Sequence, residues 1–169
     1  MLWKGALLMP DKYSPSPYPS ASGVKENVRF ARMLYGSYLA ELEAVSNYVY
    51  GSIVFGDCLD SLSSLLEHIA ETEMMHFNLL GESLKKLGIN PIIKARVQSP
   101  VIPITRDAGR GMEEEADKFI AFSINDEKKA ADEYARFATL TNDEAMKAIL
   151  QRLSEDERHH RSLLENYSP

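Results

Sequence analysis

Ile69-Ala-Glu-Thr-Glu-Met-Met-His-Phe-Asn-Leu-Leu80 is the stretch of sequence that decides the fold. Its residues favour a helix, and on a helix Glu73 and His76, three positions apart, share one face. The positions stacked with them are apolar and include Leu66 and Leu80. An ionised carboxylate is rarely buried without a partner, because desolvation disfavours the charge. Either the helical register is wrong by a turn, or a positive charge lies inside the protein.

Helical periodicity of apolar residues recurs four times along the chain. Gly56 and Asp57 form a tight break, in which Asp57 is a candidate cap for the following helix. A second tight break contains Asn142 as a candidate cap. Connections this short make the flanking helices antiparallel neighbours. The predicted helices span residues 24–55, 58–87, 112–140 and 143–166.

The connection between the second and third helices, residues 88–111, is long and irregular. Gly88-Ile-Asn-Pro91 stops the second helix, and further prolines and glycines follow among apolar residues. A helix of about 30 residues is ~45 Å long, and ~14 extended residues are enough to return along it. The segment is therefore predicted to cross from one end of an all-α four-helix bundle to the other.

The two predicted hairpins repeat one pattern of polar residues on their apolar stripes. In each hairpin, a glutamate on the first helix is followed by a tyrosine at +7, and a glutamate on the second helix by a histidine at +3. The paired glutamates are 32 residues apart in the first hairpin and 30 in the second. One Glu-x-x-His alone would be weak evidence, but chance rarely repeats the whole pattern. The positions are Glu41, Tyr48, Glu73 and His76, then Glu127, Tyr134, Glu157 and His160.

Four glutamates and two histidines converging inside four helices form the ligand set of a dinuclear metal site. Each metal ion is expected to take one histidine and one terminal glutamate, and the remaining two glutamates to bridge. The alternative, a buried polar network without metal, is unfavourable because packed carboxylates raise each other's pKa. The predicted terminal ligands are Glu41 and Glu127, the bridges are Glu73 and Glu157, and the histidines are His76 and His160.

Composition limits both the metal and the partners. The only cysteine is Cys58, which we expect to be a small packed residue. A Cys-rich metal site is therefore excluded. The remaining Glu and His ligands favour iron, manganese or zinc over copper(I). A net charge of -6 without a basic cluster argues against a nucleic-acid partner. No apolar run approaches the ~20 residues of a membrane span, and we expect a cytoplasmic protein without membrane contact.

Residues 1–22 differ from the rest of the chain, which we expect to be one bundle domain over residues 23–169. Three prolines alternate within Ser14-Pro-Ser-Pro-Tyr-Pro-Ser20, so an extended arm is predicted. It is either a loose tail or, given Trp3 and Tyr13, an arm packed on the bundle or on a second subunit. The aromatic arm and the apolar crossover favour a homodimer.

The sequence resembles the ferritin-like superfamily over about residues 24–167. Ala40-Glu-Leu-Glu-Ala-Val-Ser-Asn-Tyr48 is similar to the first helix of bacterioferritin-type proteins. Glu155-Asp-Glu-Arg-His-His-Arg-Ser-Leu-Leu164 is similar to the last metal-binding helix of rubrerythrins. The resemblance implies a four-helix bundle with a long crossover. It also implies that Asp156 orients His76, with a solvated surface position as the alternative, whereas the corresponding position in the other half is Thr72.

The chain departs from these relatives at several points. Ala130 stands where rubrerythrins carry an extra glutamate, and their Cys-rich rubredoxin domain is absent, so a peroxidase would need an external electron donor. Without the fifth helix of storage ferritins, a large iron cage is not expected. The arm, the ligand set and the missing donor domain resemble the manganese-catalase-like branch.

The functional expectation is an oxidoreductase with two iron or manganese ions, acting on hydrogen peroxide or dioxygen in protection against oxidative stress. The alternatives are a ferroxidase or iron-binding protein, and a non-enzymatic bundle with a vestigial site. Tyr48 and Tyr134 are candidates for bonding the bridging carboxylates or relaying electrons, with simple core packing as the alternative. His68 and His159 are expected to be surface or structural residues.

Overall fold

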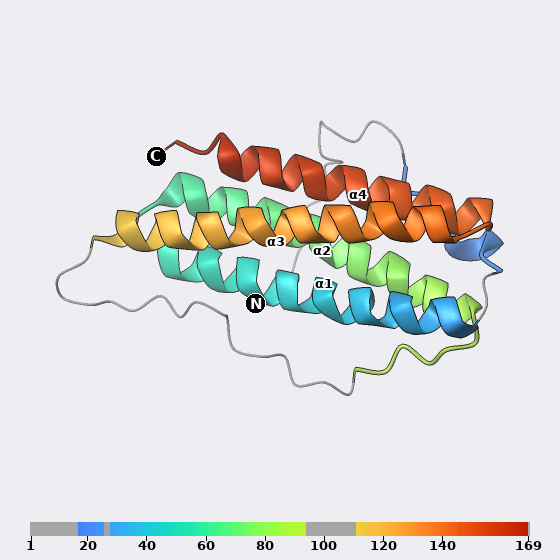
Figure 1. Cartoon of the computed structure of the whole chain (residues 1–169). Coiled ribbons are helices and arrows are strands. Elements are labelled where there is room, and N and C mark those ends of the chain that lie inside the picture. The colour runs from blue at the N-terminus through green and yellow to red at the C-terminus, as the bar shows by residue number, and fades with distance from the viewer. Residues whose placement is uncertain (1–16, 26–27, 94–110, 169) are drawn as a thin grey trace.

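The computed structural model describes residues 17–25, 28–93 and 111–168. A short 3-10 helix, η1 (Ala21–Gly23), precedes four long helices, and these confirm the predicted all-α bundle. The first and second helices form one antiparallel hairpin, and the third and fourth form another (Figure 1). The four helices are α1 (Val28–Phe55), α2 (Asp60–Lys86), α3 (Met112–Leu140) and α4 (Glu144–Glu165).

The ends of α2 and α3 require the predicted crossover. Figure 1 shows α2 ending at one end of the bundle and α3 beginning at the opposite end, so these two helices run parallel. Residues 94–110 of the connection lie outside the described residues. At the end of α2, Gly88 adopts φ 75°, and the amide groups of Gly88 and Ile89 donate to the carbonyls of Lys85 and Leu84. This pattern satisfies the last carbonyls of the helix and makes glycine the preferred residue at position 88.

The predicted caps were wrong in detail. Asp143, not Asn142, caps α4 by accepting a hydrogen bond from the amide of Met146 at 2.9 Å. Asp57 does not cap α2, which begins after Leu59 without a side-chain cap. The turn before α2 is instead closed by backbone hydrogen bonds to the carbonyl of Phe55. Cys58 lies in this turn and is exposed, so the expectation that it packs in the core was also wrong.

The first long helix begins at Val28 rather than at the predicted residue 24. Ser20 accepts a hydrogen bond from the amide of Ser22 and starts η1, after which Val24 is extended. Ala21 and Val24 are nevertheless buried in the core, so this end of the arm packs on the bundle, against α2 and α4. Trp3 and Tyr13 lie outside the described residues.

Two apolar clusters fill the bundle, one on each side of a polar layer. The first contains Leu34, Leu80, Leu150 and their neighbours, and includes Ala21 and Val24. The second contains Phe55, Leu66, Phe119 and their neighbours. Between them, all four helices carry buried carboxylates or imidazoles at the same level. No helix of the described residues is long and apolar enough to cross a membrane.

Two glycines of α1 differ in how closely neighbouring side chains pack against them. A Cβ atom at Gly51 would lie 2.7 Å from Phe119 Cζ and 2.8 Å from Leu66 Cδ1, whereas a Cβ at Gly36 meets nothing within 4 Å. We expect Gly36→Ala to raise the free energy of unfolding by about 0.5–1 kcal/mol through helix propensity. Gly51→Ala should lose that gain to overpacking, which costs ~1–3 kcal/mol. Urea denaturation of both variants checks this, and equal stabilisation by the two would contradict it.

Candidate metal centre

The structure brings all six predicted ligands together in the centre of the bundle. Each residue is at most 4% exposed, and together they come from all four long helices. They form two groups, and within each group one ligand atom per residue lies within 4.8 Å of the others. Both groups contain Glu73 and Glu157. The first group adds Glu41 and His76, and the second adds Glu127 and His160.

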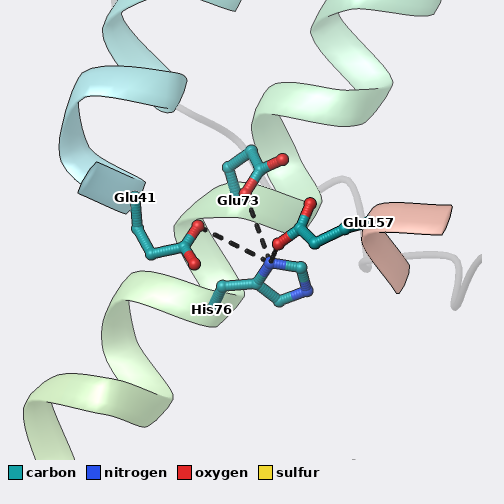
Figure 2. Close-up of side chains that lie close together, drawn as sticks. All are labelled: Glu41, Glu73, His76 and Glu157. Carbon is teal, nitrogen blue, oxygen red and sulfur yellow. Dashed lines mark hydrogen bonds and ion pairs between the residues drawn. The ribbon is translucent and has the colours of Figure 1, made fainter. Parts of the chain in front are cut away.

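The first group surrounds one nitrogen of His76. Nδ1 of this ring lies 3.1 Å from Glu157 Oε1, 3.2 Å from Glu73 Oε2 and 3.6 Å from Glu41 Oε2. Figure 2 shows the three carboxylates, from three different helices, directed toward this nitrogen. The opposite nitrogen of the ring points away from them.

The second group repeats this geometry around His160. Its Nδ1 lies 3.0 Å from Glu73 Oε1, 3.2 Å from Glu157 Oε2 and 3.7 Å from Glu127 Oε2. Each shared glutamate therefore directs one oxygen toward His76 and the other toward His160. The two imidazole rings are 5.8 Å apart between centroids. This placement is what the assignment of Glu73 and Glu157 as bridges requires.

The oxygens of this cluster are poorly satisfied by protein groups alone. One Nδ1–H cannot serve three carboxylate oxygens. Although each lies near a histidine nitrogen, Glu73 Oε1 and Glu157 Oε1 accept no hydrogen bond from the described residues. A buried carboxylate oxygen without a partner is costly. Carboxylate and imidazole ligands with unsatisfied inward oxygens suit a divalent cation such as iron, manganese or zinc, and the residues therefore fit a metal site.

Without metal, protons bound to some of the carboxylates and imidazoles offset the negative charge of the cluster. Burial, reinforced by the charges of Glu73 and Glu157, raises the pKa of Glu41 well above its usual range, and the same causes raise that of Glu127. Burial alone would raise the pKa of Glu73 too, but the neighbouring imidazolium of His160 lowers it. Burial would lower the pKa values of both histidines, yet the surrounding carboxylates raise them well above their usual range.

Tyr48 and Tyr134 hold the terminal carboxylates rather than the bridging ones. The Tyr48 hydroxyl donates to Glu127 Oε1, and the Tyr134 hydroxyl donates to Glu41 Oε1. The predicted bonds to the bridging glutamates were therefore wrong. The reason is geometric: each tyrosine reaches across the gap between α1 and α3 to the glutamate on the facing helix. Burial and the facing carboxylate raise the pKa of both phenols, which keeps them protonated as donors.

Asp156 orients His76 as the resemblance implied. Its Oδ2 lies 3.1 Å from His76 Nε2, on the side of the ring that faces away from the cluster. When the ring is neutral, as a metal ligand must be, a carboxylate at Nε2 favours the tautomer with the proton on Nε2 and the lone pair on Nδ1. Thr72 does not repeat this role, because its hydroxyl donates to the backbone carbonyl of His68. His68 and His159 are partly exposed and belong to neither group.

Two residues that support the site, Tyr18 and Arg152, were not predicted from the sequence. Tyr18 donates a hydrogen bond to Asp156 Oδ2 at 2.7 Å, and the Arg152 Nε atom lies 2.9 Å from both oxygens of Asp156. Arg152 stands four residues before Asp156 on one helix, and this spacing was a usable signal. Tyr18 gave none, because its contact depends on where the residues just before η1 lie on the bundle, and local spacing does not predict that.

A cavity of about 290 Å³ lies between α1 and α3 and reaches the cluster. Its inner lining includes the buried carboxylates of Glu73 and Glu157. Small side chains, at Ala40, Ala44 and Ala130, leave this space open. Exposed or partly exposed charged residues also line it, namely the acidic Glu43, Asp126 and Glu133 and the basic Lys129, which is paired with Asp126 at 2.9 Å. The site is therefore reached between α1 and α3, on the side where the two tyrosines lie.

Comparison with known proteins agrees with this architecture. The family model described as the ferritin-like domain matches residues 38–168, which include most of α1 and all of α2, α3 and α4. No curated protein matches the sequence. A match over this much of the chain, together with the four-helix bundle and its central Glu/His cluster, shows that the chain belongs to the ferritin-like family.

Proposed function

We propose that the protein is a dinuclear redox protein that binds two iron or manganese ions and acts on hydrogen peroxide or dioxygen. The observation that carries the proposal is the sharing of Glu73 and Glu157 between two four-residue groups. Each group supplies a terminal glutamate, a histidine and the two shared bridges. Four carboxylates offset the charge of two divalent cations, so the loaded site is close to neutral in a buried environment.

The metal pair supplies the redox chemistry: two adjacent ions that change oxidation state together exchange the two electrons that separate peroxide from water or from dioxygen. The residues of the chain do the rest. Tyr48 and Tyr134 hold the terminal carboxylates through hydrogen bonds. The cavity between α1 and α3 is large enough for peroxide or dioxygen. The apolar clusters on both sides of the site exclude bulk water.

The choice between catalase-like and peroxidase-like activity depends on the metal. With manganese held by the two glutamate and histidine groups, the site would support disproportionation of two peroxide molecules to water and dioxygen without another reactant, as in the manganese-catalase-like branch. An iron pair acting as a peroxidase, as in the rubrerythrin branch, needs an external electron donor. We further propose that the protein acts in oxidative-stress protection, in the cytoplasm and as a homodimer.

A ferroxidase is the second candidate, with Fe(II) as the substrate. Two observations favour it: membership of the ferritin-like family, and the negative charge along the cavity that leads to the site. In that lining Glu43 and Glu133 add to Asp126, whose charge is paired with Lys129. Negative charge along an entry route attracts cations. A bundle with a vestigial site is the least favoured reading, because all six ligand positions are filled by competent residues.

Metal content and peroxide turnover together test the proposed function. We expect protein from its native host to contain two iron or manganese ions per chain. With manganese bound, peroxide should be consumed without a reductant and dioxygen should be released, which an oxygen electrode measures. Fe(II) oxidation coupled to peroxide or dioxygen loss, without catalase activity, would instead identify the ferroxidase. Absence of turnover with either metal would exclude an enzyme.

Replacing a bridging glutamate should affect both metal positions, whereas replacing a terminal glutamate should affect one. We expect Glu73→Gln to abolish high-affinity binding of two metal ions, and Glu41→Gln to leave one ion bound. Glu71→Gln is the matched control, because Glu71 lies on the exposed face of the same helix. Calorimetric titration with manganese(II) measures the stoichiometry. Two tightly bound ions in Glu73→Gln would refute the bridging assignment.

Metal binding should displace protons from the site. The raised pKa values of His76, His160, Glu41 and Glu127 mean that these four groups hold protons without metal. Ligands bind metal in their deprotonated forms, so apparent affinity should rise with pH until these groups have lost their protons in the metal-free protein. Titrations in two buffers with different heats of ionisation measure the protons released. An affinity that does not change with pH would contradict this proton competition.

A further inference from the structure

The two halves of the candidate metal centre have the same ligand types, but they differ in the residues that face the outer side of the two histidine rings. Nε2 of His76 lies 3.1 Å from Asp156 Oδ2, a buried carboxylate. The residue that corresponds to Asp156 in the repeat is Thr72, whose hydroxyl bonds the carbonyl of His68 instead. The orientation of His76 is therefore fixed by a carboxylate that the repeat does not supply to His160.

Asp156 is itself held from two directions. The Tyr18 hydroxyl donates to Oδ2 at 2.7 Å. The Arg152 Nε atom lies 2.9 Å from each carboxylate oxygen, and the guanidinium carbon is 4.1 Å from the centroid of the Tyr18 ring. The Tyr18 ring also meets the His76 ring edge to face, with centroids 6.1 Å apart. Tyr18, Arg152 and Asp156 thus form one packed support behind His76.

The segment that carries Tyr18 is anchored to the bundle. Ala21 and Val24 are 3% and 5% exposed and belong to the first apolar cluster. The amide of Lys25 donates to Asp143 Oδ2 at 2.6 Å, and the same carboxylate group caps α4 through its other oxygen. Tyr18 is therefore placed by burial and hydrogen bonding a few residues further along the chain.

We propose that Tyr18 is a positioning residue that makes the two metal positions unequal. Through Asp156 it fixes the imidazole of His76, so that the position formed by Glu41 and His76 binds its metal ion more tightly than the position formed by Glu127 and His160. A carboxylate on the outer nitrogen orients a ligating histidine and increases its basicity, and loss of such a partner typically weakens metal binding by ~10–100-fold. This inference rests on the proposed dinuclear site.

Stepwise titration of the full chain with manganese(II) tests the inequality. We expect the unmodified protein to bind one ion tightly and a second more weakly. Tyr18→Phe should weaken the tight step by about tenfold and Asp156→Asn by ~10–100-fold, and neither should change the weak step. The controls are Tyr35→Phe, whose hydroxyl donates to the carbonyl of Ile92 away from the site, and Thr72→Val. Neither control should alter the affinities.

A second comparison assigns the affected position. Glu41→Gln should remove the tight step, and adding Tyr18→Phe to that variant should leave the remaining step unchanged. A general structural defect would weaken both positions, so this selectivity separates positioning from instability, and thermal unfolding of each variant monitors the fold. Two equal sites, or equal weakening of both by Tyr18→Phe, would overturn the inference while leaving the dinuclear site intact. Failure of the unmodified protein to bind two ions would instead reject the proposed function.

Discussion

The central constraint on this protein is the burial of four carboxylates and two imidazoles at one level of a helical bundle. Buried charge is tolerated only when it is compensated and its hydrogen-bonding atoms are satisfied. Here one oxygen of each shared glutamate, Glu73 Oε1 and Glu157 Oε1, is buried in the cluster without accepting a hydrogen bond from the described residues. The helices must place six polar side chains, from two sequence repeats, within reach of one another. The register of each helix therefore follows from the polar layer as much as from the two apolar clusters that flank it.

The gap between α1 and α3 differs from the gap between α2 and α4. Between α1 and α3, small side chains leave a cavity that reaches the carboxylates, and Tyr48 and Tyr134 cross the gap. On the side of α2 and α4, η1 packs against both helices and Tyr18 lies behind His76. The first gap thus holds a cavity that reaches the carboxylates, and the residues in the second gap support the His76 ring from behind. A symmetric ligand set is placed in an asymmetric environment.

Sequence periodicity predicted the bundle and the six-residue cluster because both depend on local spacing. Glu73 and His76 share a face at +3, and the repeat supplies Glu157 and His160 in the same way. The errors arose where side chains act across elements. Asp57 has the right residue type for a cap, but backbone hydrogen bonds to Phe55 close that turn instead. Tyr48 lies on the predicted stripe, but its partner depends on which helix faces it. Tyr18 depends on the path of a segment that has no periodicity.

The polar layer also explains how the two hairpins hold together. Backbones approach closely along the helices within each hairpin, whereas α1 and α3, or α2 and α4, come close at few points. Long side chains span the wider gap: Tyr48 bonds Glu127, and Tyr134 bonds Glu41, so each hairpin donates to the other. Glu73 and Glu157 each approach the histidine of the opposite hairpin. A cation held by the proposed ligands from both hairpins would act on the same contacts. Because it would bind only the folded arrangement, its binding free energy would add to the association of the hairpins.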